Sequence, residues 1–389
     1  MKILYAPDTS DHPNWGCRFM GAWYRRELLR RGADTSWRLG SRWFFRPPAE
    51  LTSPPTTWDD IQRIGADVRA GRVLPSLARA LQDCDLVLMN GENFIRPNVV
   101  KGRMLLLLAH LASQVFAKPC ILTNLTVDLS DPALAEIVAN VLPAVAQVHA
   151  REDTSRAALC DIVPGMAVGL YPDVGWTAMP LPVSEWGALA RRDDHLSAWP
   201  DVVEGFDPFV PYITVSASSV FADDEAATRA AIPAFVELTA RLRTLAPQVL
   251  LVASCEIDAM IMRNVAARTG LPLLGLNSPL PQAIDVLANA HLHVGGRWHP
   301  GIFATTGGTP LVAFDANSHK MRTLMDQLQP EAPVFDARLL HDQMNGVVAQ
   351  AAAQIDAGEA LREVLRRKAA EMAALVRGNL DGVNGERSR

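Results

Sequence analysis

The chain passes from a strand into a helix at the run Val294-Gly295-Gly296-Arg297-Trp298-His299-Pro300-Gly301, and this run decides its fold class. The residues just before the glycines, 292–294, predict a short strand. The two glycines allow the backbone to turn tightly, and Pro300 suits the first turn of a helix, where its missing N–H costs nothing. A strand that leads directly into a helix is the building unit of a parallel α/β sheet.

The same alternation of strands and helices extends from this run toward both ends of the chain. In the second half it predicts strands at 212–215, 249–253, 273–276, 292–294 and 310–314. In the first half it predicts strands at 2–6, 85–89, 120–125 and 145–149. Two such series predict an α/β protein with two doubly wound parallel sheets that face one another across a cleft.

The stretch between the two series is rich in Pro, Trp, Asp and Gly and is interpreted as a linker. An Ala-rich helical stretch closes the chain. The predicted organisation is an N-terminal Rossmann-like domain at 1–180, a linker at 181–210, a C-terminal Rossmann-like domain at 211–340, and C-terminal helices with a tail at 341–389.

Composition excludes several classes of protein. Hydrophobic residues make up 49% of the 389 residues, which excludes a wholly disordered chain. A net charge of −5 argues against binding along the phosphate backbone of a nucleic acid. Five scattered cysteines without a CxxC pair argue against a disulfide framework and a structural zinc site.

The sequence also predicts where the protein works. The longest apolar run, 104–111, contains His110 and is too short to span a bilayer. The first residues lead straight into a predicted strand rather than into a signal peptide. We therefore expect a cytoplasmic protein without an integral membrane segment.

Neither half carries a GxGxxG or a Walker motif, which argues against a conventional dinucleotide or P-loop enzyme. In doubly wound sheets, ligands bind beyond the carboxyl ends of the strands. The candidate positions are therefore the turns after Ala6, Met89, His149, Ala253 and Val294.

Arg297 and His299 are the residues best suited to chemistry. We expect them on extended chain just ahead of a helix that begins at Pro300, with their side chains on the same side. A guanidinium, an imidazole and a helix N-terminus together form a receptor for a phosphate or a carboxylate. The residues fit a structural role equally well, in which Arg297 pairs with a buried acid and His299 caps the helix.

Two further patterns leave alternatives open. His291 and His293 form a His-x-His pair, but two ligands do not make a metal site, so exposed histidines on a strand are expected. Aromatic residues alternate with arginines at 37–46, which fits either a sugar-stacking patch or a loop that covers the first core.

The run from Gly295 to Ala304, followed by Gly308 to Phe314 and Lys320, resembles the signature of the polysaccharide pyruvyl transferase family. Weaker matches follow in the same order as in that family, and together they cover about residues 1–330. They are Asn14-Trp15-Gly16-Cys17, Asn90-Gly91-Glu92 in place of a Gly-rich turn, Ala150 to Ser155, and Tyr171-Pro172-Asp173. The sequence departs from the family pattern at Cys17, where an acid is usual, and in the turn, where only Gly91 remains.

The resemblance implies a fold and a reaction. The fold is the glycosyltransferase-B arrangement, with the acceptor on the N-terminal domain and the donor on the C-terminal domain. The reaction moves the carboxyvinyl group of phosphoenolpyruvate to a saccharide or lipid-linked saccharide and forms a pyruvate ketal, as in exopolysaccharide biosynthesis. No cofactor and no metal is expected, because fixed cations can balance the charge of the donor.

The resemblance also implies roles for individual residues. Arg297 and His299 are the predicted catalytic pair, with His299 as the acid that protonates carbon 3 of the donor. Glu92 is a candidate base for the acceptor hydroxyl, or else a surface or capping carboxylate, and Asn14 binds a ligand or caps a helix. The predicted substrate-binding residues are Asn14, Gly16, Glu92, Arg151, Gly295, Gly296 and Lys320.

Two other functions remain open at this point. A glycosyltransferase that uses a nucleotide sugar would share the scaffold, although the region near Lys320 lacks an obvious pair of acids for a ribose. A non-catalytic relative that binds glycans or anions would fit the departures at Cys17 and in the thinned Gly-rich turn.

Overall fold

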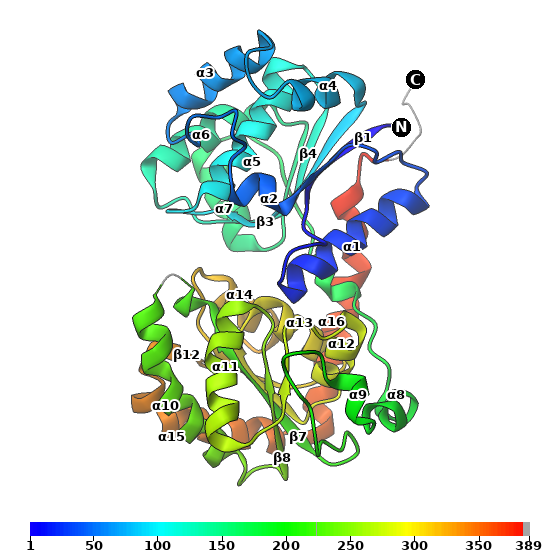
Figure 1. The fold of residues 1–389 in the computed structure, drawn as a ribbon, viewed down its shortest axis with the longest axis vertical. Coiled ribbons are helices and arrows are strands. Elements are labelled where there is room, and N and C mark those ends of the chain that lie inside the picture. The colour runs from blue at the N-terminus through cyan, green and yellow to red at the C-terminus, as the bar shows by residue number, and fades with distance from the viewer. Residues whose placement is uncertain (223, 384–389) are drawn as a thin grey trace. The chain divides into compact units, whose positions relative to one another are not determined.

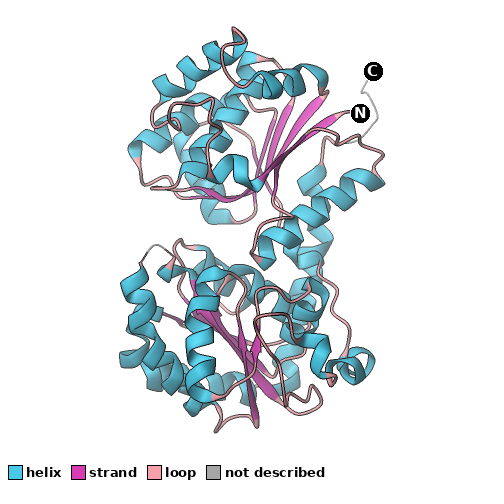
Figure 2. Cartoon of the chain, viewed as in Figure 1, coloured by secondary structure: helices cyan, strands magenta, loops and turns pink. Residues whose placement is uncertain are grey.

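The computed structural model describes residues 1–222 and 224–383 (Figure 1). Their contacts divide them into two compact units, each built on a parallel sheet of six strands. The strands, magenta in Figure 2, run through the interior of each unit with helices packed on both faces. The predicted pair of Rossmann-like domains with parallel sheets and a helical C-terminus is therefore confirmed.

Unit 1 comprises residues 1–12, 20–174 and the C-terminal segment from Leu375. Its strands are β1 (Ile3–Asp8), β2 (Arg38–Gly40), β3 (Leu86–Ile95), β4 (Cys120–Val127), β5 (Gln147–Ala150) and β6 (Val168–Leu170), in the order β2-β1-β3-β4-β5-β6. Its helices are α1 (Trp15–Arg30), α2 (Ser41–Phe45), α3 (Trp58–Arg69), α4 (Pro75–Asp83), α5 (Val100–His110), α6 (Pro132–Val141) and α7 (Asp153–Ile162).

Unit 2 comprises residues 13–19 and 175–374. Its strands are β7 (Tyr212–Ser218), β8 (Gln248–Val252), β9 (Leu273–Leu274), β10 (Leu292–Gly296), β11 (Leu311–Phe314) and β12 (Val334–Phe335), in the order β12-β11-β10-β7-β8-β9. Its helices are α8 (Val183–Ala190), α9 (Asp193–Leu196), α10 (Glu225–Leu242), α11 (Glu256–Thr269), α12 (Leu280–Ala288), α13 (Trp298–Thr306), α14 (Lys320–Leu328), α15 (Leu340–Asp356) and α16 (Gly358–Leu375).

The division into units has features that the strand and helix pattern did not indicate. Residues 13–19, which contain the first turn of α1, belong to unit 2, and the chain returns to unit 1 at the end of α16. The expected linker contains α8 and α9 and belongs to unit 2. The predicted tail beyond residue 383 lies outside the described residues.

The strand order fixes one topological switch point in each sheet. In unit 1 the chain leaves β1 in one direction to form β2 and then forms β3 on the other side of β1. In unit 2 the same reversal separates β7 from β10. A crevice opens beyond the carboxyl ends of the strands at such a point, and ligands of doubly wound sheets bind there.

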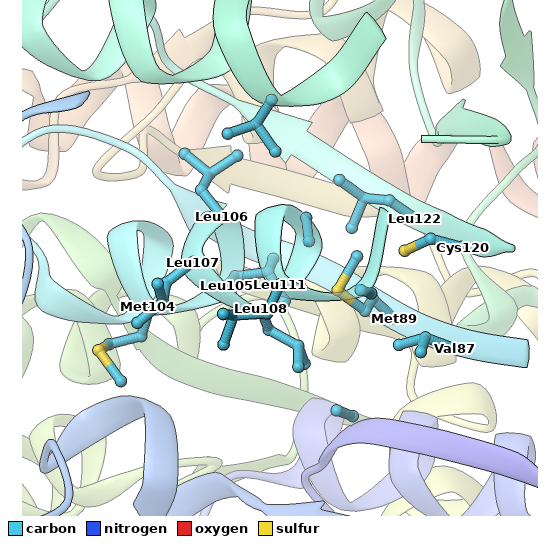
Figure 3. Close-up of a cluster of buried hydrophobic side chains, with 14 of the residues drawn as sticks. Val87, Met89, Met104, Leu105, Leu106, Leu107, Leu108, Leu111, Cys120 and Leu122 are labelled. Carbon is cyan, nitrogen blue, oxygen red and sulfur yellow. The ribbon is translucent and has the colours of Figure 1, made fainter. Parts of the chain in front are cut away.

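The core of unit 1 is dominated by α5. Its leucines 105–108 are all buried, and Figure 3 shows them in one cluster with Val87 and Met89 of β3 and Cys120 and Leu122 of β4. A helix that is apolar around its whole circumference is buried on all sides. Among the described helices, none combines the length and apolar character needed to cross a membrane.

The aromatic segment at 37–46 lies over this core. Phe44 belongs to the buried cluster, and Trp37 and Trp43 pack against it. The structure therefore supports the interpretation in which this segment covers the first core, although it forms β2 and α2 rather than a loop.

His293 lies inside the sheet of unit 2, so the expectation of exposed histidines is wrong for this residue. Its side chain is buried, and Nδ1 lies 3.0 Å from Oγ1 of Thr214. Burial lowers the pKa of His293 to about 3, because the charged imidazolium loses its hydration. His293 is therefore a neutral residue of the folded sheet.

We expect this burial to make unit 2 sensitive to acid. The pKa of His293 is lower in the folded than in the unfolded chain, so protonation favours unfolding. Stability is complete above the unfolded pKa of about 6.5 and falls as the pH decreases toward the folded pKa. Between pH 6.5 and 5 the loss from this residue is at most about 2 kcal/mol.

Denaturant unfolding at pH 7.5 and pH 5 measures this loss. The variant His293→Gln should lose less stability on acidification than the wild type. His341→Gln is the matched control, because the His341 side chain is 80% exposed. Equal pH dependence in the wild type and in His293→Gln would contradict the prediction.

Candidate functional site

The candidate site of unit 2 lies at its switch point, beyond the carboxyl ends of β7 and β10. Gly296, the last residue of β10, pairs with Ser218 of β7, and Arg297 follows directly. A Cβ atom on Gly295 would lie 2.1 Å from Oγ of Ser216, and one on Gly296 would lie 2.5 Å from Ser218. The two glycines are therefore needed for the close approach of these strands, which brings Arg297 to the crevice.

Arg297 is the N-cap residue of α13 and pairs with a buried acid. Its Nε donates to Oδ1 of Asp258 at 2.9 Å, and Asp258 is fully buried. Oδ2 of Asp258 accepts from the backbone N–H of Ser254 at 3.1 Å and from its hydroxyl at 2.8 Å. Burial on its own would lower the pKa of Arg297, but the charge of Asp258 outweighs it and raises the pKa. The structural acid considered for Arg297 therefore exists, and it holds a charged guanidinium in one orientation.

His299 lies within the first turn of α13, because this helix begins at Trp298 rather than at Pro300. The expectation that Arg297 and His299 both precede the helix on extended chain is therefore wrong for His299. Pro300 is the third helical residue, where its missing N–H would have had no partner within the helix. This explains why the helix extends further toward the N-terminus than the proline indicated.

The first turn of α1 packs directly on His299. A Cβ atom on Gly16 would lie 1.8 Å from Nδ1 of His299, so only glycine allows this contact. The backbone N–H of Trp15 donates to the carbonyl of Ser254 at 3.0 Å, which ties the turn to the residue that binds Asp258. Asp258 therefore holds Arg297, and the first turn of α1 holds His299. Ser254 connects the two, because it bonds to both Asp258 and Trp15.

Asn14 begins this turn and has a capping interaction. Its Oδ1 accepts from the backbone N–H of Cys17 at 3.2 Å, and its carbonyl accepts from Arg18 at 2.9 Å. The geometry supports the capping interpretation of Asn14. Its contact with a ligand stays a prediction.

Lys320 is the first residue of α14, and its Nζ donates to Oδ1 of Asn317 at 3.2 Å. Asn317 in turn lies 3.2 Å from the hydroxyl of Ser219, which follows β7. Lys320 is therefore joined through two polar side chains to the carboxyl edge that carries Arg297.

The other two predicted residues belong to unit 1. Arg151 follows β5 and is buried, with its guanidinium bonded to Oγ1 of Thr126 at 2.7 Å and to Asp173 at 2.6 Å. Glu92 is also buried, so the interpretation as an exposed carboxylate is wrong. Asn90-Gly91-Glu92 lies inside β3, which runs to Ile95, rather than in a turn after the strand.

Reasoning from the sequence missed Asp258 as the partner of Arg297. Ser254 ends a predicted strand and Asp258 falls in the first turn of the next helix, where acidic residues are common for electrostatic reasons. The available signal was the spacing of four residues between Ser254 and Asp258. This spacing does not indicate which basic residue pairs with Asp258. Within the described residues, no group of three His, Cys, Asp or Glu side chains is placed to hold a metal ion.

Comparison with solved structures defines the fold class. The UDP-GlcNAc 2-epimerase from Neisseria meningitidis bound to UDP-GlcNAc superposes with a TM-score of 0.56, at 11% identity and over 98% of each chain. The spinosyn rhamnosyltransferase SpnG complexed with spinosyn aglycone superposes with a TM-score of 0.51, at 13% identity, over 97% of this chain and 99% of its own. The chain thus has the glycosyltransferase-B type of fold.

The family follows from the sequence. The model of the polysaccharide pyruvyl transferase family matches residues 22–318, and the chain belongs to this family. The resemblance to this family is therefore confirmed, and the matched range includes the run from Gly295 to Phe314 but ends before Lys320. None of the curated proteins compared with the chain matches it.

Proposed function

We propose that the protein transfers the carboxyvinyl group of phosphoenolpyruvate to a saccharide and forms a pyruvate ketal, with the donor bound by unit 2. The observation that carries the proposal is the Arg297–Asp258 pair at the β7/β10 switch point, with His299 in the first turn of the adjoining helix. Membership of a transferase family supports the same reaction class.

The site suits a small anionic donor. Arginine offers five N–H donors in a planar arrangement that matches carboxylate and phosphate oxygens. Asp258 lies against the edge of the guanidinium that carries Nε and Nη2, so the rest of the guanidinium has a defined orientation. The N-terminus of α13 adds N–H groups and a partial positive charge beside Arg297.

The proposed chemistry uses His299 as a general acid. One acceptor hydroxyl attacks carbon 2 of the donor while carbon 3 takes up a proton, which gives a methyl group and a tetrahedral carbon 2. A second hydroxyl of the same saccharide then displaces phosphate and closes the ketal. The two hydroxyl protons end on carbon 3 and on phosphate, so the reaction balances without a redox partner. The donor is an intracellular metabolite, so the proposal places the reaction in the cytoplasm and its product in exopolysaccharide biosynthesis.

Release of phosphate from phosphoenolpyruvate, measured with a panel of free and lipid-linked saccharides, tests the proposal. We expect release only with a saccharide that offers two suitably placed hydroxyls, together with a new methyl singlet of the ketal in the proton NMR spectrum. Phosphate release without that methyl signal, or none with any saccharide, would contradict the proposal.

Calorimetry separates this function from the two alternatives. The proposal predicts binding of phosphoenolpyruvate and no binding of UDP- or GDP-sugars. Binding of a nucleotide sugar instead would favour a glycosyltransferase on the same scaffold. Binding of anions or saccharides without phosphate release would favour a non-catalytic relative.

A further inference from the structure

The loop that follows β11, residues 315–319, reaches β7 although β10 lies between these two strands in the sheet. The hydroxyl of Ser218, the last residue of β7, donates to the backbone carbonyl of Asp315. The backbone N–H of Asn317 donates to Oγ of Ser219, which directly follows β7, at 3.2 Å. The loop therefore crosses the carboxyl end of β10, where the chain turns into Arg297.

Gly296, the last residue of β10, allows this crossing. A Cβ atom on Gly296 would lie 2.7 Å from the carbonyl oxygen of Asp315, which is closer than real Cβ contacts come. That oxygen belongs to the backbone, so it cannot move aside as the end of a flexible side chain could. The loop after β11 is therefore packed directly on the residue that precedes Arg297.

Asn317 joins this loop to Lys320. Its Oδ1 accepts from the hydroxyl of Ser219 at 3.2 Å and from Nζ of Lys320 at 3.2 Å. With its backbone N–H, Asn317 makes two hydrogen bonds to the buried Ser219 and a third to the ammonium of Lys320. The position of the ammonium is thus tied to the end of β7 at the switch point.

Helix stability does not explain a lysine at this position. Lys320 is the first residue of α14, and a cation there meets the positive end of the helix dipole. Its ammonium ends a flexible four-carbon chain, and the entropy lost when such a side chain is ordered opposes ligand binding. A partner that holds the ammonium before the ligand arrives removes part of that cost.

We propose that Asn317 is a positioning residue, which holds the ammonium of Lys320 in place for an anionic oxygen of the donor. The inference rests on the proposed function, in which unit 2 binds phosphoenolpyruvate. Asn317 acts through Lys320 and does not itself contact the donor. Its amide is neutral, so it orients the ammonium without cancelling the charge, whereas a carboxylate would compete with the anionic donor.

Steady-state kinetics on a double-mutant cycle tests this role. Asn317→Ala should raise KM for phosphoenolpyruvate about threefold to tenfold with kcat nearly unchanged, because the ammonium must then be ordered by the donor. In the Lys320→Ala background the same change should have no further effect, since no ammonium is left to position. A merely structural role would raise KM equally in both backgrounds.

Ser318→Ala is the matched control, because it alters the same loop without touching this network. The hydroxyl of Ser318 makes no hydrogen bond to any residue in the ranges 1–222 and 224–383. We expect this variant to have the KM and kcat of the wild type.

Labelling of lysine amines with acetic anhydride, read by mass spectrometry, tests the position of Lys320 without any donor. Lys320 should be acetylated about threefold faster or more in Asn317→Ala, because its ammonium is no longer held. Asn317→Asp keeps an acceptor for the ammonium, so labelling should stay slow while KM rises. Lys118, whose Nζ donates to the carbonyl of Gln82 at 2.9 Å, is the internal reference and should react at one rate throughout.

The results separate this inference from the proposed function. The inference is overturned if Lys320 is labelled equally fast in the wild type and in Asn317→Ala, or if Asn317→Ala leaves KM unchanged or raises it equally without Lys320. Faster labelling in Asn317→Ala, without phosphate release by the wild type from phosphoenolpyruvate, would overturn the proposed function and retain Asn317 as the residue that orients Lys320. Phosphate release with unchanged labelling would retain the function and overturn the role of Asn317.

Discussion

Replacement of Arg297 by alanine should lower kcat/KM for phosphoenolpyruvate by about a hundredfold or more. A charge-assisted hydrogen bond contributes about 1.5–3 kcal/mol, so two of them to the donor amount to about 3–6 kcal/mol of transition-state stabilisation. Arg297→Lys should recover little of this activity, because a lysine cannot make the planar pair of bonds. Steady-state kinetics with phosphate detection measures both variants.

The Arg297→Ala variant needs a control for stability, because it leaves Asp258 buried and without its cation. Removing one partner of a buried ion pair costs about 3–5 kcal/mol. The double variant Arg297→Gln with Asp258→Asn removes both charges and should recover stability but not activity. Arg229→Ala is a matched control at an exposed ion pair with Glu225. Normal turnover of phosphoenolpyruvate by a folded Arg297→Ala protein would contradict the assignment of Arg297 to the donor site.

Replacement of His299 by alanine should lower kcat by about a hundredfold to ten-thousandfold, the usual contribution of a general acid. It should also remove one limb of the pH–rate profile, because the group that donates the proton to carbon 3 is then absent. The pH dependence of kcat for the wild type and the variant measures both effects. A limb that persists unchanged in His299→Ala would contradict the role of His299, and His341→Ala is the exposed control.

The variant Gly16→Ala tests the role of His299 without changing the imidazole itself. The added methyl group would lie 1.8 Å from Nδ1 of His299, so the imidazole must move. The variant should therefore lower kcat as His299→Ala does, while Arg297 remains paired with Asp258. Gly40→Ala is the control, since its nearest neighbour would be 3.7 Å away. Wild-type activity in Gly16→Ala would contradict the contact between the α1 turn and His299.

Much of the fold was predictable because the signals are local. Apolar runs such as 104–108 and the glycine pair at 295–296 act through backbone conformation and burial within a few residues. The residues at which helices and strands begin and end were less predictable. The start of α13 at Trp298 and the length of β3 through Ile95 depend on packing of distant segments, which overrides local preference.

For the candidate site, too, the sequence predicted one part and the tertiary structure determined the other. The sequence alone predicted which groups could bind an anion, since Arg297 and His299 lie at a helix start within one short motif. Folding then determined how these groups are held, because Asp258 comes from another helix and Gly16 from near the start of the chain. It also connected Glu92 of β3 to Asn124 of β4 through Asn90. Such contacts depend on strand order and register, and neither is encoded in the spacing of residues along the chain.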